Sequence, residues 1–258
     1  YLAFFAAGRY VIDQGTTAAG LPFYNAVSRG LEPKLRGFVR GQLARSGAIT
    51  DWLQTKLGPY PFATTGGLVT GLDVGFALEN QSRPTYGGWI YPGVIVHELA
   101  HQWFGDSVAV QRWRDIWLNE GFATYMEAVY AAEHGGPSLV AYLDRAYDKQ
   151  CTSPATDFWR LDIADPGADH IFDGAVYDRG AMVLAALRNR ITPVHFDTLL
   201  QTWVAAHHDG NATVEQFEAL AEQVSGEQLD GFFNAWLRSG TVPAQNNADN
   251  GLAGVFCG

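Results

Sequence analysis

Two histidines spaced four residues apart are the first side chains in this sequence whose types and spacing suggest chemistry. His97 and His101 flank Glu98-Leu99-Ala100 in a run with helical periodicity. Residues four apart on a helix share one face, so both imidazoles can reach the same metal ion. Neutral imidazole nitrogens suit zinc, and catalytic zinc sites commonly take three protein ligands and leave a fourth position for water. The pair therefore predicts a catalytic zinc site and requires a third ligand.

Glu120 is the candidate third ligand. It follows His101 after eighteen intervening residues, inside an apolar and aromatic segment that is also predicted to be helical. An unpaired carboxylate would be costly to bury in such a segment. Gly105 can end the first helix, and the residues after it leave room for the chain to turn back. We therefore expect two antiparallel helices to converge on one zinc ion per chain, bound by His97, His101 and Glu120.

Glu98, which lies next to His97, suits the role of a general base. Zinc lowers the pKa of a bound water to about 7, so a nearby carboxylate can take the proton at neutral pH. Glu98 can lean toward the open coordination position and then pass the proton to a leaving amine as general acid. This combination predicts the hydrolysis of peptide bonds.

The elements that must position these residues form two blocks. Glycine and proline interrupt short β-rich runs in the first third, with one predicted helix over residues 33–57, and helical periodicity dominates from about Val94 onward. Strands followed by helices indicate an α+β chain with an N-terminal mixed β-sheet lobe, residues 1–92, and a helical lobe, residues 93–258, that carries the zinc site. The predicted strands are 2–12, 21–27, 67–74 and 76–80, and the later helices are 94–104, 115–134, 138–149, 175–191, 193–208, 214–224 and 227–237.

Composition limits the classes of partner. The chain has 258 residues, of which 47% are apolar and 17% charged, so it can bury a large core. A net charge of −10 without a basic cluster argues against nucleic acid and anionic membrane surfaces. No run approaches the roughly 20 apolar residues of a spanning helix, so we expect a soluble chain, either cytoplasmic or secreted. The pairing of Cys151 with Cys257 and the oligomeric state stay open.

The histidine and glutamate segments resemble the zinc signature of the aminopeptidase N family of zinc metallopeptidases, or gluzincins. The resemblance rests on the eighteen-residue gap and on two runs, His97-Glu98-Leu99-Ala100-His101-Gln102-Trp103-Phe104-Gly105 and Trp117-Leu118-Asn119-Glu120-Gly121-Phe122-Ala123. It covers most of the chain. It implies a thermolysin-like two-lobed catalytic domain that releases N-terminal residues from peptide substrates.

The same resemblance implies a role for Tyr177. The family has a tyrosine in a Tyr-x-x-Gly-Ala segment that stabilises the tetrahedral intermediate, and Tyr177-Asp178-Arg179-Gly180-Ala181 is similar to that segment. A phenol with a pKa near roughly 10 stays protonated at neutral pH and can donate a hydrogen bond to a developing oxyanion. Tyr177 is therefore the second expected catalytic residue.

A third segment, Phe76-Ala77-Leu78-Glu79-Asn80, resembles the Gly-x-Met-Glu-Asn motif that the family carries on a substrate-lining edge strand. The resemblance implies that Ala77, Glu79 and Asn80 bind substrate and that Glu79 pairs with the free α-amine. Phe76 replaces the glycine and Leu78 the methionine, so we expect a reshaped pocket for the first substrate residue. These departures leave endopeptidase action as an alternative.

The position of the first residue suggests a further alternative. The chain starts inside a predicted strand, and members of the family normally carry a β-rich domain before the catalytic one. We therefore expect that upstream sequence has been removed. A catalytically weak peptide-binding module that lacks its upstream domain is the alternative that follows, whereas no residue selects the epoxide hydrolase activity known for one branch of the family.

Overall fold

The computed structural model describes residues 5–152 and 156–258. These residues group into two compact units, one that ends at Ser107 and one that begins at Val108. The first unit contains a mixed β-sheet with helices, and the second is mostly helical. This order confirms the predicted α+β class. The functional division into residues 1–92 and 93–258 stays a prediction.

The sheet of the first unit has the strand order β1-β2-β3-β4. Antiparallel pairing joins β1 (Tyr10–Thr16) to β2 (Pro22–Ser28), and parallel pairing joins β2 to β3 (Thr65–Val69) and β3 to β4 (Thr85–Tyr86). Every residue of β3 is buried, as is usual for a central strand covered on both faces. Segment 76–80, predicted as an edge strand, makes a single bridge between Leu78 and Thr85 instead.

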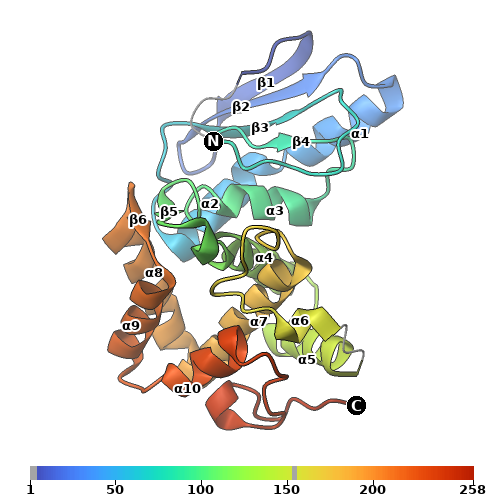
Figure 1. The fold of residues 1–258 in the computed structure, drawn as a ribbon. Helices are drawn as coiled ribbons and strands as arrows, with labels where there is room; N and C mark the ends of the chain where they lie inside the picture. The colour runs from blue at the N-terminus through green and yellow to red at the C-terminus, as the bar shows by residue number, and fades with distance from the viewer. Residues whose placement is uncertain (1–4, 153–155) are drawn as a thin grey trace. The chain divides into compact units, whose positions relative to one another are not determined.

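The helix predicted over residues 33–57 consists of two helices, α1 (Pro33–Leu43) and α2 (Ser46–Leu57), which pack on the sheet (Figure 1). The break follows from Asn25 on β2. Its amide nitrogen donates to the Leu43 carbonyl at 3.2 Å, and its oxygen accepts from the Ser46 hydroxyl at 3.1 Å. The buried asparagine thus binds both ends of the break, which one-dimensional periodicity cannot reveal.

The first unit ends with α3 (Pro92–Ala100), and the second unit begins with a strand, β5 (Val108–Val110), that pairs with β6 (Gly210–Ala212). Helix α9 begins with a capping box between Thr213 and Gln216 and ends at Gly226 in the left-handed conformation, both of which are local sequence signals. Sequence periodicity missed α6. The other elements of this unit are η1 (Trp113–Asp115), α4 (Trp117–Glu133), α5 (Leu139–Thr152), α6 (Thr156–Arg160), α7 (Gly174–Ile191), α8 (Pro193–His207), α9 (Val214–Ser225), α10 (Asp230–Phe233), the π-helical η2 (Asn234–Arg238) and η3 (Ala248–Asn250).

Aromatic packing fixes α4 within the second unit. Phe217 of α9 is fully buried, and its ring lies 5.9 Å from Trp117, 5.2 Å from Phe122 and 5.3 Å from Trp203, measured between ring centroids. All three pairs are edge-to-face, the arrangement that aromatic quadrupoles favour. The helix that carries Glu120 is therefore anchored by large apolar side chains on both sides of that residue in the sequence.

A disulfide joins α5 to the C-terminal segment. Cys151 of α5 forms a disulfide with Cys257, with 6.0 Å between the two Cα atoms, so the pairing left open by the sequence is present.

Across the described ranges 5–152 and 156–258, none of the helices combines the length and the hydropathy needed to cross a membrane.

Candidate metal centre

Helix α3 and its C-cap position two imidazoles and one carboxylate. Pro92 occupies its first turn, where a missing N–H costs nothing, and its apolar residues Val94, Ile95, Val96 and Leu99 are buried. His97 and His101 lie one turn apart, with 4.8 Å between their ring centroids. Glu98, between them, is only 5% exposed.

The main chain after α3 orients the second histidine. The Nδ1 atom of His101 lies 3.0 Å from the Phe104 carbonyl oxygen. A proton on Nδ1, donated to that carbonyl, makes Nε2 the nitrogen that can bind a metal ion. Gly105 has a φ of 134°, a value that glycine adopts readily, and the Asp106 N–H then donates back to the His101 carbonyl at 2.9 Å. Helix α3 ends earlier than the predicted residue 104, at Ala100 with His101 as its C-cap, and Gly105 lies in the turn that follows.

Glu120 belongs to the first turn of α4. Its N–H donates to the Ile116 carbonyl at 3.1 Å, and its side chain is buried. A carboxylate near a helix N-terminus is favoured by the partial positive charge of the unpaired N–H groups there. The fold therefore tolerates a buried anion at this position, which the apolar sequence around it would otherwise disfavour.

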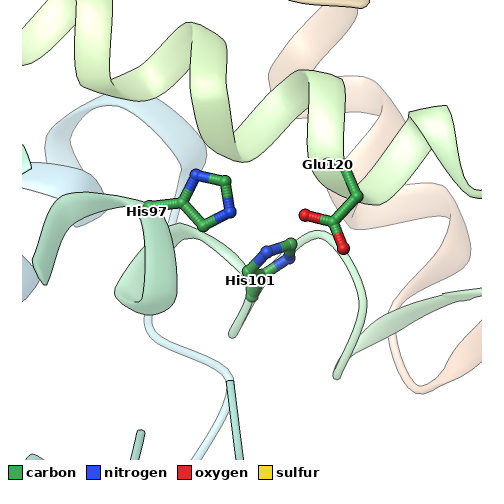
Figure 2. A group of neighbouring side chains, drawn as sticks. All are labelled: His97, His101 and Glu120. Atoms are coloured by element: carbon green, nitrogen blue, oxygen red, sulfur yellow. The ribbon is translucent and has the colours of Figure 1, made fainter. Parts of the chain in front are cut away.

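The structure brings the three predicted ligands together. Each of His97, His101 and Glu120 offers one ligand atom, and these atoms all lie within 4.8 Å of one another. Figure 2 shows the three side chains directed toward a common point. Two imidazole nitrogens and one carboxylate oxygen are the donor set of many catalytic zinc sites, and three protein ligands leave a coordination position for water. The group therefore fits a zinc ion by the chemistry of its donors.

Burial alters the acidity of groups near α3 in the first unit. Burial raises the pKa of the Asp106 carboxyl to about 7, an effect that the His101 imidazole opposes and the Glu79 carboxylate reinforces. Burial also raises the pKa of the Tyr86 phenol well above its usual value, and the charge of Glu98 adds to that rise. The surroundings of α3 therefore disfavour additional negative charge, and a bound cation would relieve this cost.

Tyr177 lies in the first turn of α7, which Asp173 caps by accepting from the Ala175 N–H at 2.8 Å. It is half-buried. Helix α7 packs against α4, and the backbones meet at two glycines: a Cβ built on Gly180 would lie 2.8 Å from the Cα of Gly121. Tyr177 precedes Gly180 by about one helical turn, and Glu120 directly precedes Gly121.

Segment 76–80 separates its side chains into two groups. Glu79 and Asn80 are 8% and 9% exposed, whereas Phe76 and Leu78 are 57% and 43% exposed. Phe76 and Leu78 line a cavity of about 620 Å³, and the lining does not include Ala77, Glu79 or Asn80. Other lining residues include Leu68, Thr70, Gly71, Leu72 and Val74. The two residues that depart from the family motif thus share a cavity with the sheet, because alternate side chains of extended backbone point in opposite directions.

Sequence reasoning assigned no role to Gln102 and Arg179, although both lie inside the quoted runs. Gln102 is fully buried, and its amide nitrogen donates to the Glu79 carbonyl at 3.1 Å. The buried Arg179 guanidinium donates to the Trp159 carbonyl at 2.9 Å and also to the Leu161 carbonyl. Burial lowers the pKa of Arg179 to about 10. A charged residue within an apolar stretch of helix was the available signal for Arg179.

Comparison with known proteins extends these observations. Residues 67–236 match the peptidase family M1 domain. Aminopeptidase A of Gloydius brevicauda is 31% identical over 187 residues, and the match covers 69% of this chain and 19% of the relative. Aminopeptidase N of Streptomyces lividans is 31% identical over 216 residues, and the match covers 74% of this chain and 25% of the relative. The crystal structure of an M1 zinc metallopeptidase from Deinococcus radiodurans aligns with 92% of this chain and 53% of its own, at 26% identity and a TM-score of 0.75. The chain thus spans a quarter or less of the length of these two curated relatives.

Proposed function

Because the chain belongs to peptidase family M1, we propose that it is a zinc metallopeptidase that hydrolyses peptide bonds and, more specifically, an aminopeptidase that releases N-terminal residues. The convergence of the His97, His101 and Glu120 ligand atoms within 4.8 Å carries this proposal. The names of the two aminopeptidase relatives, each about 31% identical, support the choice of reaction.

One zinc ion per chain is part of the proposal, with His97, His101 and Glu120 as its ligands. When bound, zinc would lower the pKa of a water molecule to about 7 and polarise the scissile carbonyl. Each protein ligand has a defined role: His97 of α3 and His101 at its C-cap would supply imidazole nitrogens, and Glu120 of α4 would supply a carboxylate oxygen. Burial of His101 and Glu120 limits competition by bulk water.

Glu98 and Tyr177 are the proposed catalytic residues. Glu98 accepts a proton from the attacking water and delivers it to the nitrogen of the leaving amine. Tyr177 donates a hydrogen bond from its phenol to the oxyanion that develops on the scissile carbonyl oxygen.

Glu79, Asn80 and Ala77 are the proposed substrate-binding residues. A Glu79 carboxylate that is 8% exposed can pair with a substrate ammonium group in a partly dry environment, where a charge-assisted hydrogen bond is strong. The main chain at Ala77 and the amide of Asn80 can bind the substrate backbone. An N-terminal amine would then be required for good binding, which would make the enzyme an aminopeptidase.

Peptide hydrolysis by the purified chain with zinc tests the proposal. We expect a peptide with a free amine to be cleaved from its N-terminus, and the acetylated form of the same peptide to be cleaved at least about a hundredfold more slowly, because the Glu79 partner is lost. Chromatography of the products measures both rates. Equal rates on the two peptides would replace aminopeptidase action with endopeptidase action.

Two variants separate metal binding from proton transfer in the same assay. Glu98→Gln should retain one zinc per chain by metal analysis and lose hydrolysis, because the amide cannot accept the proton. His101→Ala should lose both zinc and hydrolysis. A folded chain without bound zinc, or hydrolysis that survives Glu98→Gln, would contradict the mechanism. Peptide binding without any hydrolysis would favour a peptide-binding module.

A further inference from the structure

The side chain of Gln102 joins two segments of the first unit. It directly follows His101 and is fully buried. Its Nε2 donates to the Glu79 carbonyl at 3.1 Å, while its Oε1 accepts from the Ser82 N–H at 2.6 Å and from the Tyr60 hydroxyl at 3.3 Å. A carboxamide can serve both segments because it carries donors on one atom and an acceptor on the other.

These bonds support a turn that the backbone alone disfavours. The turn spans residues 80–83, with the Arg83 N–H donating to the Asn80 carbonyl at 2.9 Å. Ser82 has a φ of 59°, in the left-handed region that non-glycine residues seldom adopt. The N–H that Gln102 accepts belongs to this residue. Strained backbone persists only where surrounding contacts hold it, and Gln102 supplies one of those contacts.

The turn belongs to a loop between Leu78 and Thr85, and the ends of this loop are bonded to each other beside the sheet. Leu78 and Thr85 exchange two backbone hydrogen bonds, of 2.9 and 2.7 Å. Glu79 and Asn80 follow directly and are nearly buried. The loop is therefore held by the sheet on one side and, through Gln102, by the end of the helix that carries the two histidines.

We propose that Gln102 is a positioning residue for the free α-amine of the substrate. By fixing the main chain at Glu79 relative to α3, it sets the place of the Glu79 carboxylate with respect to His97 and His101. The inference rests on the proposed aminopeptidase function. A displacement of about 1 Å at a substrate-positioning group can cost about a hundredfold in rate, so a buried tether at this point has a direct consequence for selectivity.

Two substitutions test the role of the Gln102 hydrogen bonds. Gln102→Glu keeps an oxygen for Ser82 and Tyr60 but places a second acceptor against the Glu79 carbonyl, and Gln102→Met removes all of the bonds at similar side-chain length. Both should raise the KM for a free-amine tripeptide by about tenfold or more and change kcat by less than about threefold, because binding of the amine is weakened while Glu98 is left in place. Zinc content should be unchanged.

Gln54 provides a matched control in the same unit. Its Oε1 accepts from the Tyr60 N–H at 3.1 Å, and its Nε2 donates to Asp51 at 3.4 Å. Among the described residues, these bonds do not reach the segment between Leu78 and Thr85. Gln54→Met therefore removes a carboxamide contact without touching that loop, and its KM should equal that of the unsubstituted chain. An equal rise in KM for Gln54→Met, or an unchanged KM for both Gln102 variants, would overturn the inference.

A binding measurement separates this inference from the proposed function. In chains that also carry Glu98→Gln, calorimetry should show a tripeptide Kd about tenfold higher with Gln102→Met than without it, and no such difference for the acetylated tripeptide. Absence of hydrolysis by the unsubstituted chain would refute the proposed function alone, because the binding measurement still decides the role of Gln102. An unchanged Kd, or no tripeptide binding before Gln102 is altered, would refute the inference.

Discussion

Tyr177, the proposed oxyanion donor, is held by its helix without being fully buried. It lies in the first turn of α7, whose start is fixed by the Asp173 cap. The buried residues around it in the sequence, Val176 and Arg179, anchor the turn from the interior. The Arg179 guanidinium also lies over the ring of Trp159, at 5.8 Å from its centroid. The turn is thus constrained on its inner face, while the Tyr177 side chain stays half-buried.

The proposed role of Tyr177 leads to a kinetic prediction. Tyr177→Phe removes only the hydroxyl, so kcat should fall by about 10²–10³-fold while KM stays nearly constant, because the hydrogen bond forms only in the transition state. Steady-state kinetics on a free-amine peptide measures both. Tyr142→Phe, which removes a hydroxyl from a half-buried tyrosine of α5, is the control and should leave kcat unchanged. A kcat for Tyr177→Phe within twofold of the unsubstituted chain would exclude an oxyanion role.

At the scale of elements, the crossing of α4 and α7 sets the spacing between Glu120 and Tyr177. The two helices share more contacts than any other pair of elements within the described residues, and their backbones touch at Gly121 and Gly180. A Cβ on Gly121 would lie 2.8 Å from the Cα of Gly180, closer than side-chain carbons are found. Only glycine at both positions permits this approach, because a methyl group would push the helix axes apart.

Gly180→Ala should therefore destabilise the chain. We expect the free energy of unfolding to fall by about 1–3 kcal/mol, since the clash is with backbone and neither helix can yield locally. Urea denaturation followed by circular dichroism measures the change. Gly174→Ala, at the start of the same helix with nothing within 4 Å of its Cβ, is the matched control and should change stability by less than about 0.5 kcal/mol. A Gly180→Ala chain as stable as the control would show that the crossing relaxes without cost.

Over the whole chain, the longest covalent link joins the C-terminal segment to α5. The disulfide between Cys151 and Cys257 joins positions 106 residues apart. Around it, the Tyr147 hydroxyl donates to the Pro243 carbonyl at 2.6 Å, and the Gly258 N–H donates to Asp148 at 2.9 Å. These contacts attach the segment after η2, which is poor in secondary structure, to α5 within the second unit.

Reduction of the disulfide should lower stability. We expect the free energy of unfolding to fall by about 2–5 kcal/mol in the presence of a reductant, because the cross-link restricts the unfolded chain over a long loop. Urea denaturation with and without the reductant measures this. A chain with both Cys151→Ser and Cys257→Ser should match the reduced protein and show no further response. A reductant effect that persists in the double variant would locate its origin elsewhere.

Features that depend on residues close together in the chain could be predicted from the sequence alone. The i to i+4 spacing of His97 and His101, the capping box at Thr213 and the left-handed stop at Gly226 are all local, so periodicity and residue type suffice to predict them. The α+β order followed in the same way. Family resemblance, rather than local physics, supplied Tyr177 and Glu79, whose roles stay predictions.

Features that depend on residues far apart in the chain became apparent only in the folded structure. It brought the ligand atom of Glu120 to those of the two histidines, broke the 33–57 helix at a buried Asn25, paired the two cysteines and gave Gln102 its partners at Glu79 and Ser82. The physical reason is the same in each case. Hydrogen bonds, packing and cross-links between distant segments form only when the hydrophobic core places their backbones side by side, and no local pattern records that placement.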